Sequence, residues 1–279
     1  MRVLVTGAAG SIGTVVCSGL TDRGHDVVGL DRMAEPEGFT GRWFTADCAD
    51  PDAVDAVFGE LSQAGRLDAV VHLAGRPTEG TLPEELESHV LTTAALLDAM
   101  VAHGVNRIVY ASSNHAVGRT ERRELLGVDV RPRPDTFYGV AKVTAEAMLS
   151  LYADRHGIDA VATRIGSFLA QPESRRGLST WLSHDDAVRM VEACLTAPDP
   201  GFAVIYGISA NTRAWWDLAP GRALGYHPED DAEAWAAELE AQPASADDEE
   251  EAARVGGPYA TRRFERPALD RHDASSDRG

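Results

Sequence analysis

Short apolar runs alternate with longer amphipathic stretches over residues 1–167. Each run carries apolar side chains at most positions, a pattern typical of parallel strands that are buried on both faces, and the stretches between them repeat apolar residues at helical spacing. This alternation predicts an α/β fold with a doubly wound parallel sheet, whose ligands bind outside the carboxyl ends of the strands. The predicted strands are Arg2–Thr6, Asp26–Leu30, Trp43–Ala46, Leu67–Leu73, Arg107–Ala111 and Ala160–Arg164, and the helices cover Ile12–Leu20, Ala53–Ala64, Glu84–His103 and Asp135–His156.

The pattern becomes irregular after Ser167. We expect a helix from Ser183 to Leu195, a strand at Phe202–Ile208 and a helix at Pro228–Gln242. From Pro243 onward the chain is polar with few apolar anchors, which predicts disorder or a loosely docked tail. The predicted organisation is therefore a core at 1–167, a small substrate-binding appendage at 168–242 interleaved with it, and an acidic tail at 243–279.

A glycine pattern, GAAGSIG, follows the first predicted strand and opens the first helix. Glycines there let the backbone approach a pyrophosphate, and the free N–H groups of the helix bind it. Without a ligand the same stretch would be only a tight turn, but its position between strand and helix favours a Rossmann-type dinucleotide site. The predicted contacts are Gly7, Gly10, Ser11, Ile12 and Gly13.

Asp31 follows the second strand, where a carboxylate can accept both hydroxyls of the adenosine ribose and repel a 2'-phosphate. This position predicts NAD as the cofactor, although Arg32 beside it could partly offset that repulsion. Asp47 is placed to meet the adenine edge or to cap the next helix. The remaining predicted cofactor contacts lie at strand ends or on the catalytic helix: Cys48, Leu73, Ala74, Gly75, Lys142 and Ile165.

Tyr138 and Lys142 lie four residues apart on the helix at Asp135–His156, so their side chains share one face. Such a pair is commonly an ordinary surface contact. Lys142 is, however, the only lysine among 26 basic residues, which suggests a task that a guanidinium does not perform. An ammonium beside Tyr138 favours the phenolate, so we predict that Tyr138 is a general base with a lowered pKa.

The net charge of −18 argues against a nucleic-acid or anionic-membrane partner. Residues 229–251 hold 11 of the acidic side chains. Cys17, Cys48 and Cys194 are widely spaced and form no ligand cluster, so we expect reduced thiols, no metal site and a cytoplasmic protein.

Taken together, the glycine pattern, Asp31 and the Ser113/Tyr138/Lys142 set resemble the extended short-chain dehydrogenase/reductase superfamily over roughly residues 1–240. Within it, the stretches ASSNHAVG, FYGVAK, RIGS, LSTWLSHDD and SANTRAWWD look like uronate dehydrogenase. The resemblance implies NAD-dependent oxidation of C1 of cyclic D-galacturonate or D-glucuronate to the aldarolactone, in a homo-oligomer. It implies that Tyr138 is the base and that Lys142 binds the nicotinamide ribose. The implied substrate contacts are Ser113, Asn114, His115, Ser167 and Arg176.

Two positions depart from the family, since His89 stands where an asparagine is common and Pro77 where a small hydroxyl residue is expected. Several readings stay open on sequence alone. Arg175 or Arg176 could clamp a carboxylate, or both could be solvated surface cations. A nucleotide-sugar epimerase or dehydratase shares the tyrosine and lysine, and a non-catalytic NAD-sensing protein would share the dinucleotide fold alone.

Overall fold

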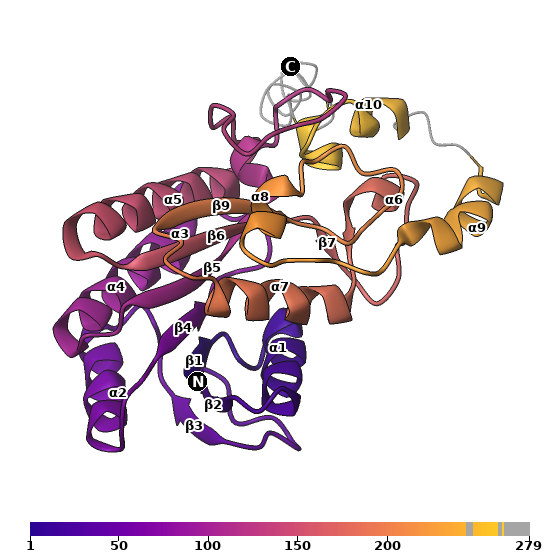
Figure 1. Cartoon of the computed structure of the whole chain (residues 1–279). Helices are drawn as coiled ribbons and strands as arrows, with labels where there is room; N and C mark the ends of the chain where they lie inside the picture. Colours follow the sequence, from indigo (N-terminus) through magenta and orange to yellow (C-terminus); the bar gives the residue numbers. More distant parts are fainter. Residues whose placement is uncertain (244–247, 262–263, 265–279) are drawn as a thin grey trace, which may run out of the picture.

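The computed structural model describes residues 1–243, 248–261 and 264, and it confirms the predicted parallel α/β sheet (Figure 1). Seven strands, all parallel, lie in the order β3-β2-β1-β4-β5-β6-β9. The order runs outward in both directions from the β1–β4 pair, which makes this pair the switch point at which ligands bind in such sheets. The strands are β1 (Arg2–Thr6), β2 (Asp26–Asp31), β3 (Arg42–Thr45), β4 (Ala69–His72), β5 (Arg107–Ser113), β6 (Asp159–Ile165) and β9 (Phe202–Gly207).

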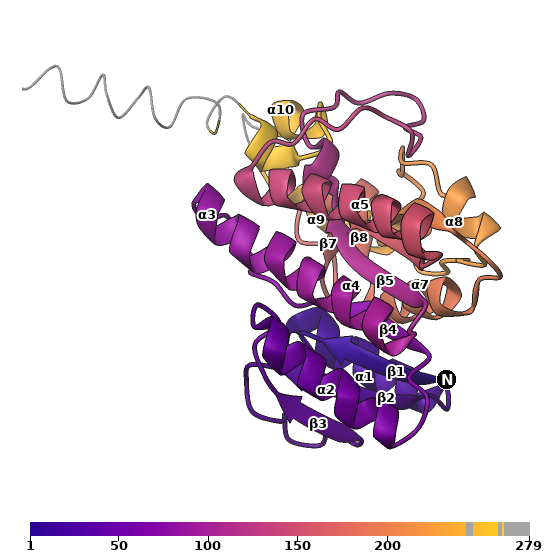
Figure 2. The same ribbon diagram turned by 90° about the vertical axis from the view of Figure 1, so that its left-hand side faces the viewer.

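Helices cover both faces of the sheet. On β1, Val3 and Val5 belong to one buried cluster and Leu4 to the other, so the continuous apolar run follows from burial on both faces. One face is covered by α1 (Ser11–Asp22) and α7 (His184–Thr196), whose apolar residues join the cluster of Val3. The other is covered by α2 (Pro51–Gln63), α4 (Thr92–His103) and α5 (Phe137–His156), which lie side by side in Figure 2.

The helix predicted at Glu84–His103 is a longer, composite helix. It begins with α3 (Leu82–Glu85), capped by Thr81, continues as a π-helical segment η1 (Leu86–Leu91) and ends as α4. The predicted C-cap, Gly104, has the left-handed conformation expected there, with φ +70°. The π-helical segment lies against the start of α5 and therefore reaches the candidate site.

The helix predicted at Pro228–Gln242 begins later than expected. Residues 228–231 are not helical, and a 3-10 turn η3 (Ala232–Trp235) leads into α9 (Ala236–Ala241). The backbone amides of Glu229 and Asp230 donate instead to the buried carboxylate of Asp186. This tertiary contact holds the segment outside the helix.

The appendage also contains a small sheet and two short helices. The strand β9, from the region after Ser167, extends the main sheet beside β6. The other elements are β7 (Ser167–Phe168), α6 (Gly177–Thr180), β8 (Trp181–Leu182) and α8 (Ala219–Ala223).

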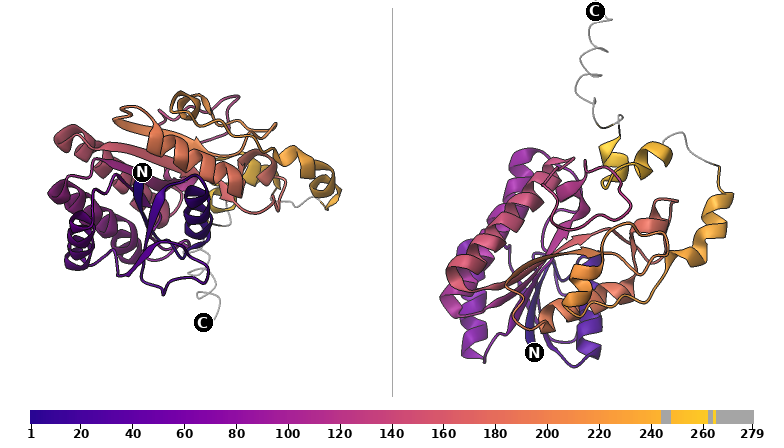
Figure 3. Two further views of the ribbon diagram at one scale, coloured as in Figure 1. Left: turned by 60° about the horizontal axis from the view of Figure 1, so that its bottom comes forward. Right: turned by 45° about the horizontal axis from the view of Figure 1, so that its top comes forward.

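The described part of the predicted loose tail packs against the body of the protein. It forms α10 (Asp248–Ala252) and a 3-10 turn η4 (Gly257–Ala260), and Val255 is fully buried. The Val255 and Gly256 amides donate to the carbonyls of Thr120 and Gly118, which explains why the yellow segment in Figure 3 lies beside the connection between β5 and α5. The expectation of a loose tail is therefore wrong for residues 248–261, and its remainder lies outside the described residues.

Among the described residues, no helix is both long and apolar enough to cross a membrane.

Candidate active site

The glycine pattern forms a close-packed turn at the switch point. Gly7 has a φ of +68°, and a Cβ on it would lie 2.6 Å from the Ala74 nitrogen. A Cβ on Gly13 would lie 2.1 Å from the Gly7 carbonyl oxygen, so α1 can approach β1 only because this residue has no side chain. Within the part of the chain that the structure describes, no side chain caps the N-terminus of α1, so its first N–H groups are available. This cradle fits a pyrophosphate.

Asp31 lies at the end of β2, where its carboxylate is held by two backbone amides. Ala9 donates to Oδ2 at 3.0 Å and Met33 donates to Oδ1 at 2.9 Å. Each carboxylate oxygen keeps a second lone pair with which to accept a ribose hydroxyl. The geometry therefore suits an NAD ribose at this strand end.

Replacing Asp31 with serine is expected to weaken NAD binding roughly 10- to 150-fold, because a hydrogen bond to a charged group contributes about 1.5–3 kcal/mol. Binding of NADP should change far less, since the carboxylate that repels its 2'-phosphate is lost. Fluorescence titration with both dinucleotides measures the change, and Asp129→Ser, at an exposed loop position, serves as the control. Unchanged NAD affinity in Asp31→Ser would contradict this role.

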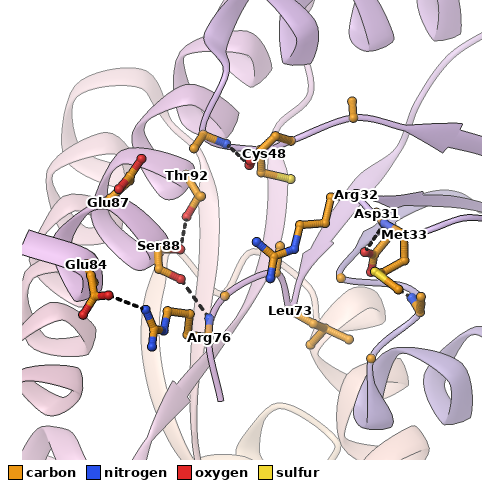
Figure 4. A pocket seen from close by; sticks show the side chains of 18 residues that line it. Asp31, Arg32, Met33, Cys48, Leu73, Arg76, Glu84, Glu87, Ser88 and Thr92 are labelled. Carbon is orange, nitrogen blue, oxygen red and sulfur yellow. Dashed lines mark hydrogen bonds and ion pairs between the residues drawn. The ribbon is translucent and has the colours of Figure 1, made fainter. Parts of the chain in front are cut away.

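A cavity of about 500 Å³ opens between these strand ends (Figure 4). The cavity is also lined by four residues that were not predicted as cofactor contacts: Arg76, Glu84, Ser88 and Thr92. Arg76 reaches the Glu84 carboxylate at 3.0 Å, and its amide donates to the Ser88 hydroxyl at 2.8 Å. Of the predicted cofactor contacts, the following line the cavity: Gly7, Gly10, Asp31, Asp47, Cys48, Leu73, Ala74 and Gly75. The others lie in α1 (Ser11, Ile12, Gly13), in α5 (Lys142) and at the end of β6 (Ile165).

Tyr138 and Lys142 share one face of α5, as predicted. The helix is capped by the Thr136 hydroxyl, which accepts from the Gly139 amide. Glu79, from the connection after β4, accepts from the Phe137 and Tyr138 amides. Lys142 Nζ lies 5.2 Å from the centre of the Tyr138 ring and donates to the Ala111 carbonyl at 2.7 Å. The tyrosine is thereby fixed at the mouth of the sheet with the ammonium beneath it.

The predicted lowering of the Tyr138 pKa is wrong for the protein on its own. Part of the side chain is exposed, yet burial raises the pKa of Tyr138 to about 12, against a smaller lowering by the Ser113 hydroxyl. Burial lowers the pKa of Lys142 to about 7. Removal from water disfavours the charged form of both groups, and it is the largest effect on each pKa.

Ser113, Asn114 and His115 turn into the site at the end of β5. Ser113 begins a 3-10 turn η2 (Asn114–Val117), and its hydroxyl accepts from the His115 amide. His115 Nδ1 lies 2.9 Å from the fully buried carboxylate of Asp135, and its ring packs edge-on against Tyr138 at 5.9 Å. This polar cluster therefore meets the Tyr138 ring directly.

Arg176 is linked to Ser167 through the Thr180 hydroxyl and to Asn114 through the Val255 carbonyl. The Thr180 hydroxyl lies 3.2 Å from Ser167 Oγ and 3.4 Å from Arg176 Nη1. The Val255 carbonyl accepts from Arg176 Nη2 at 2.6 Å and from Asn114 Nδ2 at 3.0 Å. The structure thus brings the predicted substrate contacts together around the C-terminal segment.

Three further residues border the site without having been predicted to contact a ligand. Tyr259, in η4, packs its ring edge-on against His115 at 4.9 Å. His89 packs against Tyr138 at 5.0 Å, and Glu85 lies fully buried one helical turn before it. Of these three residues, only His89 was marked in the sequence, because it stands where an asparagine is common in the resembled superfamily.

The fold and the placement of Tyr138 and Lys142 define a dinucleotide-binding protein of the extended short-chain dehydrogenase/reductase type. Comparisons with known proteins agree. A model of the NAD dependent epimerase/dehydratase family matches residues 3–184. Uronate dehydrogenase from Pseudomonas syringae pv. tomato is 37% identical over 261 residues, which cover 92% of each chain.

Two solved structures are similar over nearly the whole chain. A uronate dehydrogenase mutant from Agrobacterium tumefaciens, complexed with NAD, has a TM-score of 0.84 at 36% identity, and glucuronic acid dehydrogenase from Chromohalobacter salexigens has 0.84 at 34%. Each covers 93% of this chain and 96% of its own. The chain belongs to the NAD dependent epimerase/dehydratase family and, within it, to the uronate dehydrogenases. The prediction of an NAD-dependent oxidoreductase is confirmed.

Proposed function

We propose that this protein oxidises C1 of a cyclic hexuronate, D-galacturonate or D-glucuronate, to the aldarolactone. The observation that carries the proposal is the environment of Arg176. This guanidinium is half-buried, and burial lowers its pKa to about 10 against smaller opposite effects of the Glu251 and Asp135 charges. Among the described residues, no carboxylate lies within ion-pair distance of it. A buried cation without a paired anion is costly. A sugar carboxylate would supply the missing partner and, for Arg, a bidentate one.

In the proposed reaction, C1 loses a hydride to NAD and its hydroxyl proton to Tyr138. When bound, NAD supplies the hydride acceptor and a positively charged ring. Tyr138 needs such additional positive charge, because Lys142 alone leaves its pKa near 12. Ser113 would orient the anomeric hydroxyl and Ser167 would contact the sugar, while Asn114 and His115 would line its other side.

Lys142 would bind the nicotinamide ribose and hold the ammonium beneath the phenol. Its contact with the Ala111 carbonyl directs the amine toward the mouth of the sheet rather than toward solvent. The cradle of Gly7, Gly10 and Gly13 would hold the pyrophosphate, and Asp31 the adenosine ribose. The glycine cradle, Asp31 and Lys142 would thus each hold a different part of the dinucleotide.

The docked C-terminal segment favours a small free sugar over a nucleotide sugar. Val255 and Tyr259 lie against Asn114 and His115, so the room beyond these residues is already partly filled. A diphosphate-linked sugar would require this space.

The test is NADH production with hexuronates, their uncharged parent sugars and UDP- or dTDP-sugars. We expect turnover with at least one hexuronate and little with the parent aldose. Larger thermal stabilisation by a nucleotide sugar than by any hexuronate would instead support an epimerase or dehydratase. An absence of NAD reduction with every sugar would support an NAD-sensing protein.

A further inference from the structure

Glu85 is a buried acid beneath the candidate active site, and the proposed mechanism leaves it without a role. It ends α3 and has 0% of its surface exposed. Neither carboxylate oxygen has a hydrogen-bond donor at normal geometry among the described residues, although the Gly80 amide is close enough to favour the charged form. Buried carboxylates without donors are rare, because the cost of removing them from water is uncompensated.

The surroundings of Glu85 lead to Tyr138. His89, one turn further along, is 1% exposed, and its Nε2 lies 3.3 Å from the Glu85 carboxylate. The His89 ring packs edge-on against Tyr138 with 5.0 Å between the ring centres. A Cβ on Gly75, which lines the dinucleotide cavity, would lie 2.4 Å from His89 Nδ1. The pair therefore lies between the cavity and the tyrosine.

Lys142 is a buried cation, only 4% exposed, whose one hydrogen bond among the described residues goes to the neutral Ala111 carbonyl. The other buried acid near it is Glu146, one turn along α5. Arg164 binds both oxygens of Glu146, at 3.0 and 2.8 Å, and Ser112 donates to one of them. The charge of Glu146 is therefore matched by Arg164. Glu85 forms no ion pair with Lys or Arg among the described residues, and the nearest guanidinium, that of Arg76, which also favours its ionised form, is paired with Glu84.

We propose that Glu85 is the buried counter-charge of the Lys142 ammonium and thereby sets the pH range in which Tyr138 and Lys142 work together. With Glu85 ionised, Lys142 charged and Tyr138 neutral, this group carries no net charge. Without Glu85 it would carry one uncompensated positive charge away from water. Glu85 acts through space on its neighbours and is a positioning residue rather than a catalytic one.

The pKa directions agree with this arrangement. The negative charge of Glu85 raises the pKa of Lys142 against the lowering by burial, and it also raises the pKa of Tyr138. Burial raises the pKa of Glu85 itself. The other titratable groups that act on these three residues are Arg76, Glu79 and Glu84 near the carboxylate, and His72, His89, Tyr110 and Glu146 near the lysine.

The sole lysine allows a direct test that needs no turnover. Protein labelled with carbon-13 at lysine Cε should give one lysine resonance, whose pH titration reports the pKa of Lys142. In Glu85→Gln the pKa should fall by roughly one unit, since a nearby buried charge contributes on that scale. Glu238→Gln removes the same charge from an exposed position on α9 and should leave the titration unmoved.

The kinetic part of the test rests on the proposed function, whereas the lysine titration does not. Removing the negative charge lowers the pKa of both Lys142 and Tyr138. The profile of kcat/KM against pH should therefore move as a whole to lower pH, by roughly one unit on each limb. On the alkaline limb Glu85→Gln should be about tenfold slower than wild type at the same pH. If the protein oxidised no hexuronate but Glu85→Gln still lowered the pKa of Lys142, the proposed function would be rejected and this inference would stand.

Three results would overturn the inference. An unmoved Lys142 titration in Glu85→Gln would mean that Glu85 is uncharged throughout. An activity loss of the same factor at every pH would mean a merely structural role. If the glutamine variant does not fold, Glu85→Asp carries the test. Aspartate keeps the negative charge but holds it one methylene further away, so the pKa of Lys142 should fall by less than in Glu85→Gln. A Lys142 pKa in Glu85→Asp equal to that of wild type would reject the proposal.

Discussion

Replacing Tyr138 with phenylalanine is expected to lower kcat for the hexuronate by about 10³-fold, because a positioned general base typically contributes 10²–10⁴. The phenyl ring keeps its packing against His89 and His115 and loses only the hydroxyl. The melting temperature and the dissociation constant of NAD should therefore change little. Steady-state kinetics, thermal denaturation and fluorescence titration measure the three quantities.

The matched control is Tyr152→Phe, which removes a hydroxyl near the far end of the same helix. Tyr152 donates to Asp98 at the surface between α5 and α4 and has no contact with the candidate site. Its turnover should remain within about threefold of wild type, as expected for a surface substitution. Wild-type turnover in Tyr138→Phe would remove Tyr138 from the mechanism.

The sheet could be predicted because each strand is recognisable from its own short run of residues. Each predicted strand is a run of side chains that are buried on both faces, as Val3, Leu4 and Val5 are in β1, so the pattern needs no knowledge of distant neighbours. The ends of α5 were similarly readable to within two residues. Thr136 caps its start, and Gly157 has a φ of +66° at its end.

The C-terminal segment was mispredicted because its anchors are distant in the chain. Val255 accepts hydrogen bonds from Asn114, 141 residues earlier, and from Arg176, 79 residues earlier. Nothing in the polar composition around it signals those partners. The late start of α9 has the same origin, since the Asp186 carboxylate takes the amides of Glu229 and Asp230.

The candidate site was predictable in its residue types but not in its electrostatics. Spacing alone places Tyr138 over Lys142, whereas the direction of their pKa shifts depends on how deeply the fold buries both groups. Glu85 illustrates the limit. In the sequence it is one of several acids at the start of a helix, as the helix dipole favours, and only tertiary packing encloses it beside His89.

Arg176→Met is the second substitution for which we expect a large effect. It removes the guanidinium proposed to bind the sugar carboxylate and keeps much of the side-chain volume. The loss of one partner from a buried, hydrogen-bonded charge pair costs about 2–5 kcal/mol, so kcat/KM for the hexuronate should fall roughly 30- to 4,000-fold. The kcat/KM for the uncharged parent sugar should change by less than about fivefold, because that substrate has no carboxylate to lose.

Arg175→Met distinguishes the two neighbouring arginines, which the sequence left equivalent. Arg175 donates to the backbone carbonyls of Glu240 and Gln242, beside α9, whereas Arg176 meets Thr180 and Val255 at the site. The Arg175 variant should therefore keep its preference for hexuronate over parent sugar. Equal losses on both substrates in Arg176→Met would show that the residue only holds the C-terminal segment. A lost preference in Arg175→Met would move the carboxylate site to its neighbour.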